Sequence, residues 1–205
     1  MTDTQMLAKS HYERRANDAY YTQPRVTQAL LDAIKLRGRV WEPASGRQDM
    51  VRVLEQAGYQ VFASDLAEDR DTVFGGNFFG FLRAQRGYET IITNPPFSDA
   101  ERFVRHALHL MEPVGGIVCM LLRNEWDSAA SRTTLFTDKP FRAKLVLTFR
   151  PRWDWWETDK PLAGADISLG VNLAPKKPKV SPRHNFSWYV WDWRHTGPPT
   201  LGWLS

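Results

Sequence analysis

The chain has 205 residues, of which 42% are hydrophobic and 13% aromatic, and its formal net charge is +4. This is enough apolar material for one globular core but leaves little for a second domain. No run of about 18 uninterrupted apolar residues occurs, which argues against a membrane-spanning helix. Because Cys119 is the single cysteine, it can form no internal disulfide, and we expect it to be a buried small hydrophobic residue.

The first residues of the chain, Met1 to Asn17, are polar and lack the apolar core of a secretion signal. We therefore expect a soluble, cytoplasmic protein. The composition predicts a flexible N-terminal segment at residues 1–18, followed by a single domain at residues 19–205.

Short β-prone segments alternate with amphipathic segments along the rest of the chain. The apolar periodicity predicts helices at residues 24–36, 50–57 and 99–111, and strands at residues 39–42, 59–63, 89–93, 116–122, 144–149 and 186–191. Residues 116–122 are almost continuously apolar, which is typical of a strand buried on both faces of a parallel sheet. The alternation predicts an open α/β sheet. Residues 174–184 are basic and proline-rich, which favours a loop.

Polar clusters follow three of the predicted strands. They are Glu42 to Gly46, Asp65, and Asn94 to Phe97. Because open α/β sheets bind ligands at the carboxyl ends of their strands, we expect these clusters to form one site.

Asn94-Pro95-Pro96-Phe97 is the most specific of these clusters. The Asn94 side-chain oxygen and the Pro95 carbonyl can accept both hydrogens of an exocyclic amine, while Pro95 and Pro96 restrict the loop. Phe97 offers a face on which an extruded base can stack. The loop resembles the signature of the amino-methyltransferases, Asp/Asn/Ser-Pro-Pro followed by an aromatic residue, and this resemblance implies that all four residues are catalytic. A rigid turn after a strand is the alternative.

The segment from Val40 to Gly46 resembles the first cofactor motif of the same family, in which a strand ends in an acidic residue and a glycine loop follows. The resemblance implies that Glu42 pairs with the ammonium of the methionine moiety of S-adenosylmethionine. Pro43 and Ala44 belong to the same loop, and Gly46 allows close approach of the backbone to the ligand. Arg47 and Gln48 depart from the pattern, because small residues are usual there. A surface charge or helix cap is the alternative for Glu42.

Two further segments resemble parts of the cofactor site. Asp65, with Leu66 beside it, has the spacing from Glu42 at which α/β nucleotide binders place a carboxylate on ribose hydroxyls. Asn77-Phe78 resembles the family's Asp-Phe pair, with Asn77 in place of the acid that accepts from the cofactor adenine. A solvated Asp65 and a core position for Phe78 are the alternatives.

Tyr21-Thr22-Gln23-Pro24 resembles the N-terminal Tyr-x-Thr-Pro cofactor motif, with threonine one residue early. A helix that starts here could present backbone donors to the methionine carboxylate, which implies cofactor contacts for Tyr21, Thr22 and Pro24. A plain helix start is the alternative.

The last third of the chain is basic and rich in tryptophan. Between Arg142 and Arg194 there are ten lysines and arginines against five acids, and seven of the nine tryptophans follow residue 152. Bases stack on such rings and arginines bind phosphates, so we expect a nucleic-acid partner. The candidate contacts are Arg123, Arg150, Arg152, Trp153, Lys176 and Lys177. The strand pattern favours core positions for Trp188, Trp191 and Trp193.

The order of these motifs is similar to that of small phage-type orphan adenine methyltransferases of class I. The resemblance implies a Rossmann-like α/β fold with a seven-stranded, mostly parallel sheet and flanking helices. It also implies S-adenosylmethionine as cofactor and the exocyclic amine of adenine in double-stranded DNA as substrate. The same loop occurs in methyltransferases that act on RNA bases and on protein glutamine, which stay open as alternatives.

A non-catalytic nucleic-acid-binding protein is a further alternative, in which Arg47 and Asn77 would mark lost cofactor motifs. The five histidines and the lone cysteine lack the spacing of zinc ligands, so we expect no metal. We expect a monomer or a homodimer, because nothing in the sequence specifies the assembly.

Overall fold

The computed structural model describes residues 21–66, 74–84, 86–152 and 184–205. The expected flexible segment at residues 1–18 and residues 174–183 of the basic loop lie outside this part of the chain.

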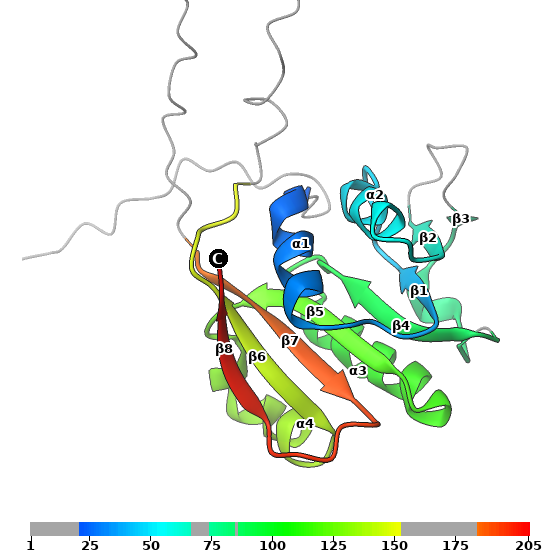
Figure 1. Ribbon diagram of the computed structural model, residues 1–205. Coiled ribbons are helices and arrows are strands. Elements are labelled where there is room, and N and C mark those ends of the chain that lie inside the picture. Colours follow the sequence, from blue (N-terminus) through cyan, green and yellow to red (C-terminus); the bar gives the residue numbers. More distant parts are fainter. Residues whose placement is uncertain (1–20, 67–73, 85, 153–183) are drawn as a thin grey trace, which may run out of the picture.

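An eight-stranded mixed sheet forms the centre of the molecule, with the strand order β3-β2-β1-β4-β5-β7-β6-β8 (Figure 1). The strands are β1 (Arg39–Glu42), β2 (Val61–Asp65), β3 (Phe74–Gly75), β4 (Tyr88–Thr93), β5 (Ile117–Arg123), β6 (Phe141–Leu147), β7 (Phe186–Asp192) and β8 (Thr200–Leu204). Only β7 runs against its neighbours, and it pairs antiparallel with β5 and β6. The predicted open, mostly parallel α/β sheet is confirmed.

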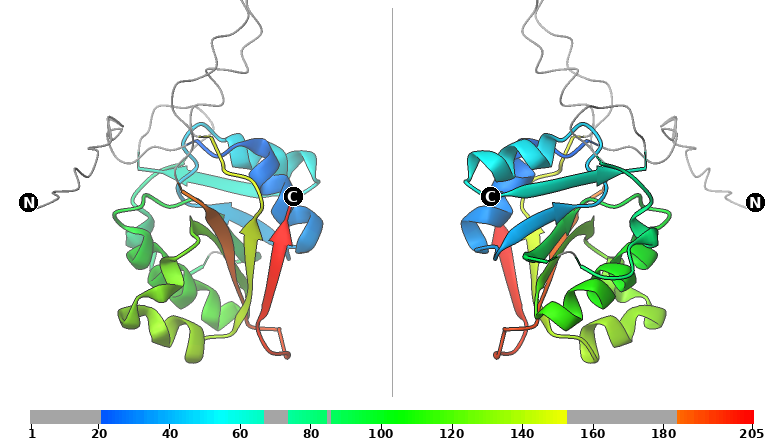
Figure 2. Two further views of the ribbon diagram at one scale, coloured as in Figure 1. Left: turned by 90° about the vertical axis from the view of Figure 1, so that its left-hand side faces the viewer. Right: turned by 90° about the vertical axis from the view of Figure 1, so that its right-hand side faces the viewer.

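Helices cover both faces of the sheet. They are α1 (Pro24–Ala33), α2 (Asp49–Gln56), α3 (Ala100–Met111) and the short α4 (Thr133–Thr137). The side views place α1 and α2 on one face and α3 and α4 on the other (Figure 2). None of the helices that the structure describes is long and apolar enough to cross a membrane.

Each face of the sheet has its own hydrophobic core. On the first face, Val26 and Leu30 of α1 and Leu54 of α2 pack with sheet residues that include Leu121 and Cys119. Burial raises the pKa of the Cys119 thiol, so this residue is a packing residue, as expected. On the second face, α3 packs against the sheet together with many aromatic residues.

The tryptophans of β7 belong to these cores. Trp188 and Trp191 are fully buried, and their indole N–H groups donate to Val26 O at 3.0 Å and Leu135 O at 2.7 Å. The predicted core positions are therefore confirmed for both. Trp193 packs against the second core while partly exposed.

The sheet has eight strands, whereas the residue patterns predicted six and the resemblance implied seven. The two-residue β3 and the C-terminal β8 were not predicted, because β3 is too short to show a period and β8 contains Gly202 in its centre. β8 adds an eighth strand by pairing parallel with β6. In addition, α1 ends at Ala33, three residues before the predicted end, because Ile34 is already extended. Ile34 and Leu36 are nonetheless buried, which explains the longer apolar pattern.

Candidate active site

The three polar clusters predicted from the sequence meet at one edge of the sheet. β1 lies between β2 and β4, and the chain order changes direction between β1 and β4. Glu42 ends β1, Asp65 ends β2, and Asn94 directly follows β4. Open α/β sheets bind ligands in the crevice outside such a switch point, because the flanking connections leave in opposite directions there.

Glu42 is buried at this switch point, with 1% of its surface exposed. Its Oε1 atom accepts from the Ala44 backbone N–H at 3.1 Å, and its Oε2 atom has no partner of hydrogen-bond geometry in the described part of the chain. Burial raises the pKa of Glu42 to about 8, and the charge of Asp65 adds to this rise, whereas the Thr93 side chain and the Ala44 N–H oppose it. A positive charge placed beside this carboxyl group would favour its ionised form.

The loop after β1 has the backbone of a glycine motif although it contains one glycine. Gly46 and Gln48 both have left-handed conformations, with φ of 47° and 64°. The Gly46 N–H donates to Asp65 Oδ2 at 2.8 Å, which ties the ends of β1 and β2 together. Gln48 therefore takes a conformation that glycine adopts most readily.

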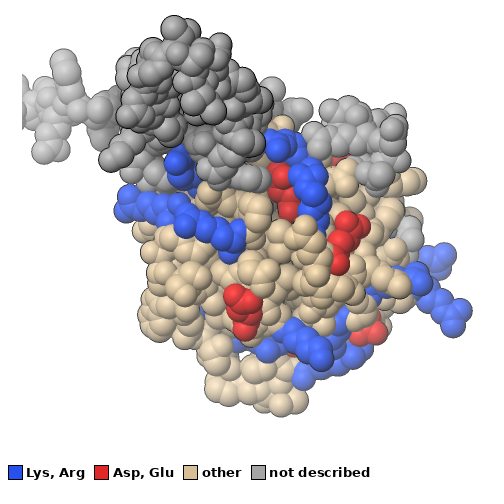
Figure 3. All heavy atoms as spheres, turned by 45° about the horizontal axis from the view of Figure 1, so that its top comes forward, with Lys and Arg blue, Asp and Glu red and all other residues tan. Residues whose placement is uncertain are grey.

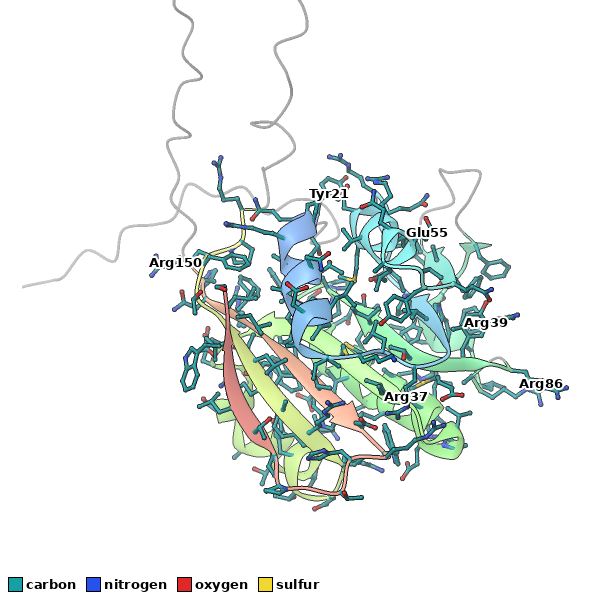
Figure 4. All side chains as sticks on the ribbon, viewed as in Figure 1. Tyr21, Arg37, Arg39, Glu55, Arg86 and Arg150 are labelled. Atoms are coloured by element: carbon teal, nitrogen blue, oxygen red, sulfur yellow. The ribbon has the colours of Figure 1, made fainter. Side chains whose placement is uncertain are left out.

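Tyr21 and Thr22 lie directly against the two loops of this edge. A Cβ atom at Gly46 would lie 3.7 Å from the Tyr21 ring, and the Arg47 guanidinium lies 4.9 Å from the centre of that ring. The Thr22 hydroxyl accepts from Asn94 Nδ2 at 3.1 Å. Figure 4 shows Tyr21 at the end of α1 that faces this edge, opposite Arg37. Pro24, by contrast, is exposed at the first position of α1.

The segment Asn94 to Phe97 connects β4 to α3. Pro95 is buried, and the Pro96 carbonyl accepts from the Asp99 N–H at 3.1 Å just before the helix. The Phe97 ring stacks on Phe186, with centroids 5.7 Å apart and planes inclined by 29°. The Arg123 guanidinium lies 5.4 Å from the centre of the Phe97 ring. A base that stacks on Phe97 would therefore meet Arg123.

The residues expected around the cofactor's adenosine part fall into two groups. Leu66 is 74% exposed beside Asp65, so an apolar surface is present at the end of β2. Phe78 is 3% exposed and packs on Trp41 and Phe103, so it lies in the core, which is the alternative interpretation of this residue. Asn77 is exposed, and its side-chain oxygen accepts from the Phe79 N–H at 3.0 Å as the cap of a short 3₁₀ helix.

The candidate nucleic-acid contacts lie partly at the same edge. Arg123 ends β5, and Arg150 donates to Asn185 Oδ1 at 3.0 Å beside the start of β7. The Arg152 backbone N–H donates to Gln23 Oε1 at 2.9 Å, which holds this segment against the start of α1. Figure 3, which brings the upper side of the molecule forward, shows lysine and arginine side chains along the upper left and upper middle of the described surface. Trp153, Lys176 and Lys177 lie outside the described residues.

Three other cations of the C-terminal third are held in ion pairs. Asp192, opposite the first residue of β5, accepts from Arg37 at 2.8 Å and Arg142 at 3.0 Å, while Arg194 pairs with Glu89 at 2.9 Å. Lys144 pairs with Asp127 at 2.7 Å. Three of the ten lysines and arginines counted in this third, Arg142, Lys144 and Arg194, are therefore in ion pairs, and Trp188 and Trp191 are buried in the core.

Two residues of the site were not recognised in the sequence. Thr93 lies beside Glu42, and Gln23 joins the Arg152 segment to α1. Thr93 was visible only as the last residue of a predicted strand, and Gln23 only as a member of the N-terminal motif, with no role of its own. Within the described ranges, no group of three His, Cys, Asp or Glu side chains could hold a metal ion. His106 packs on Phe78 and Phe79.

Comparison of the sequence with protein-family models gave no match, and neither did comparison with curated proteins. The structure is similar to a proposed RNA methyltransferase from Pyrococcus horikoshii, with a TM-score of 0.51, 13% identity, and coverage of 82% of this chain and 80% of the other. It is also similar to a proposed class I S-adenosylmethionine-dependent methyltransferase from Listeria monocytogenes, with a TM-score of 0.51 and 13% identity. In that case 88% of this chain matches 63% of the other.

The chain therefore has the fold of the class I S-adenosylmethionine-dependent methyltransferases. At this level of identity the similarity concerns the fold alone, and function must be argued from the residues of the site.

Proposed function

We propose that the protein transfers a methyl group from S-adenosylmethionine to the exocyclic amine of adenine in DNA. One observation carries the proposal. The loop Asn94 to Phe97 leaves β4 at the switch point of a class I methyltransferase fold, next to the buried carboxyl group of Glu42. The amine-holding loop and a cation-binding group are thus at the same edge of the sheet.

The residues at this edge fit the groups of S-adenosylmethionine. Glu42 has a buried oxygen without a partner in the described structure, and a ligand ammonium would supply the missing donor. Gly46 has no side chain to keep a ligand from the backbone. Asp65 ends the neighbouring strand, where a carboxylate can accept from ribose hydroxyls, and the exposed Leu66 offers an apolar surface to the adenine ring.

The catalytic loop would act by holding and orienting the substrate amine. When bound, the cofactor supplies an electrophilic methyl group on a sulfonium. The Asn94 side-chain oxygen and the Pro95 carbonyl accept the two amine hydrogens, which aligns the nitrogen lone pair with that methyl. The N–CH3 bond would form as the S–CH3 bond breaks, which would leave a neutral thioether. The methylated nitrogen, acidic only at that point, would then lose its proton to water, so no strong base is needed before transfer.

Nucleic acid is the substrate class that the surroundings of the loop support best. Arg123 lies 5.4 Å from the centre of the Phe97 ring, and Arg150 donates to Asn185 just before Phe186, on which Phe97 stacks. An adenine turned out of the helix can stack on an aromatic ring and leave its phosphates to arginines. These contacts would serve an RNA base equally well. RNA is therefore the second candidate substrate, and the Pyrococcus protein of the same fold is described as an RNA methyltransferase.

The test is to incubate the full chain with labelled S-adenosylmethionine and, in separate reactions, unmethylated genomic DNA, total RNA and protein extract. Digestion to nucleosides and amino acids then identifies the labelled product. We expect N6-methyladenine from DNA, and a loss of at least about 100-fold in rate for Asn94→Ala, because the main orienting acceptor is removed.

Label in RNA or in glutamine would replace DNA as the substrate while keeping methyl transfer. Absence of label in all three, together with no calorimetric binding of S-adenosylmethionine at millimolar concentration, would leave the non-catalytic nucleic-acid-binding alternative. Asp32→Asn, an exposed substitution on the outer side of α1, is the control and should keep the wild-type rate.

A further inference from the structure

Arg25 lies at the active-site edge, on the first turn of α1. Three residues earlier, the Thr22 hydroxyl contacts Asn94 at 3.1 Å, so this end of α1 is next to the catalytic loop. Arg25 is exposed, and its guanidinium lies 4.0 Å from the centre of the Phe149 ring. A guanidinium this close lies over the face of the ring, which holds it in place while its N–H donors remain available to a further acceptor.

Successive contacts continue from that ring to the catalytic loop. Arg150, the residue after the ring, donates to Asn185 Oδ1 at 3.0 Å, and Asn185 directly precedes Phe186. Phe97 of the catalytic loop stacks on Phe186, and the Arg123 guanidinium lies 5.4 Å from the centre of the Phe97 ring. The start of α1 is thus joined, contact by contact, to the ring on which a base would stack.

Three exposed arginines, Arg25, Arg150 and Arg123, therefore lie along one side of the site, which we call the arginine rim. Within the described ranges, no carboxylate pairs with Arg25 or Arg123. By contrast, Arg142 at the opposite end of the sheet pairs with Asp192 at 3.0 Å. The rim thus carries positive charge that these parts of the chain do not neutralise with an acid.

We propose that the arginine rim binds the phosphates of the nucleic-acid strand that carries the target base, with Arg25 and Arg123 as the two outer contacts. The inference rests on the proposed function for the class of partner, a nucleic acid. A base stacked on Phe97 brings its own phosphates beside Arg123, and an arginine fork can bind a phosphate through two N–H groups. Because the rim continues from there to the start of α1, the flanking phosphates of the same strand are the anions that fit its other arginines.

The test is binding of a fluorescein-labelled DNA duplex, measured by fluorescence anisotropy at salt concentrations from about 50 to about 300 mM. This measurement needs no methyl transfer. We expect Arg25→Gln and Arg123→Gln each to weaken the Kd for DNA by about 3- to 10-fold at about 100 mM salt, and to reduce the slope of log Kd against log salt concentration by about one. The double variant should reduce the slope by about two, because the two contacts are separate.

Arg39→Gln is the matched control. Arg39 is also an exposed arginine near an aromatic ring, 6.0 Å from the centre of the Tyr88 ring, but it begins β1, whereas Glu42 ends that strand at the active site. Figure 4 shows Arg39 and Arg150 on opposite sides of the molecule. The variant removes one positive charge, as Arg25→Gln does, and should keep the wild-type slope and a Kd within about twofold. Thermal unfolding of each variant would ensure that folded proteins are compared.

Equal losses for Arg39→Gln and Arg25→Gln would mean that only net charge matters, and this would overturn the rim. An unchanged slope for either rim variant would overturn it as well, and so would a wild-type chain that binds neither the duplex nor RNA of the same sequence. Tighter binding of the RNA, with the same losses in the rim variants, would support the rim and change the substrate.

Binding and methyl transfer separate this inference from the proposed function. A wild-type chain that binds DNA but methylates nothing would contradict the proposed function, while losses in the two rim variants would still support the rim. Methyl transfer to DNA with wild-type slopes in both rim variants would contradict the rim alone.

Discussion

At the scale of a single residue, the surroundings of Glu42 change its ionisation. A carboxyl group with one buried oxygen bonded to Ala44 N–H and the other unbonded within the described structure resists ionisation, and its pKa is raised from an ordinary 4.5 to about 8. A group in this state gains a favourable charge interaction only when a cation arrives, because burial penalises the lone carboxylate.

The pH dependence of cofactor binding follows from this shift. Below pH 8 most of the ligand-free protein carries a neutral Glu42, whereas the ammonium of S-adenosylmethionine binds the carboxylate, so binding must release a proton. As the pH rises from 6 to 8, we expect the Kd for S-adenosylmethionine to fall by up to about tenfold per pH unit. Calorimetry in buffers of different ionisation enthalpy would measure the released proton.

Glu42→Gln provides the control for this prediction. The variant should bind the cofactor more weakly. Its Kd should lose the pH dependence that comes from Glu42 and keep only the part that comes from titration of the cofactor itself.

The raised pKa of Glu42 also gives a stability effect of known sign. The folded ligand-free protein holds this proton more tightly than the unfolded chain, so its stability should fall as the pH rises from about 4.5 to about 8, and Glu42→Gln should remove that fall. A pH-independent Kd in the wild type contradicts the assignment of Glu42.

At the scale of an element, the loop between β1 and α2 places a residue other than glycine in the left-handed region. Gln48 stands at φ 64°, next to Gly46 at φ 47°, and the Gly46 N–H reaches Asp65. A left-handed conformation costs a residue with a side chain about 1–2 kcal/mol, whereas glycine adopts it without that cost.

Substitutions at position 48 can therefore separate conformation from side-chain chemistry. We expect Gln48→Gly to raise the free energy of unfolding by up to about 1 kcal/mol, and Gln48→Val to lower it by about 1–3 kcal/mol, because a β-branched side chain is the least tolerated in this region. Urea denaturation would measure both. An unchanged Kd for S-adenosylmethionine in Gln48→Gly would mean that cofactor binding depends on the loop conformation at position 48. A much weaker Kd would instead mean that the Gln48 side chain contacts the ligand.

At the scale of the molecule, the active-site edge and the ion pairs of Asp192 lie at opposite ends of the sheet, because Asp192 pairs with the first residue of β5 and Arg123 ends that strand. Asp192 is 3% exposed and accepts from Arg37, Arg142 and the Arg194 N–H, so it joins the segment after α1 to β6 and β7. Burial would raise the pKa of Asp192, but the hydrogen bonds and charges of Arg37 and its neighbours outweigh this and lower it.

Loss of this carboxylate should therefore destabilise the protein without changing the chemistry. We expect Asp192→Asn to lower the free energy of unfolding by about 3 kcal/mol at pH 7, because it leaves Arg37 and Arg142 without their shared anion. The wild-type contribution is present above the ordinary pKa of aspartate and is lost as the pH falls, so the two proteins should converge below about pH 4. The methyl-transfer rate per folded molecule should stay at the wild-type value, and a large loss of rate at full folding would contradict the separation of the two ends.

The sequence by itself determined the fold class and the loops of the candidate site. The strands before Asn94, Glu42 and Asp65 were visible because their apolar residues recur locally, and a local period survives in any tertiary context. Because ligands of open sheets bind at the carboxyl ends of the strands, the loops after these strands were then expected to form one site. β3 could not be found in this way because its two residues show no period, and β8 could not because Gly202 interrupts its pattern.

Only the tertiary structure decided which contacts these residues make. Thr22 and Asn94 are 72 positions apart, Gln23 and Arg152 are 129 apart, and neither pair has a local pattern. The resemblance implied a cofactor contact for Phe78, which is buried in the core. Arg142 and Arg194 were counted in the basic third, and they pair with Asp192 and Glu89. Side-chain partners across a sheet depend on how distant segments pack, and this is not recorded in the spacing of residues along the chain.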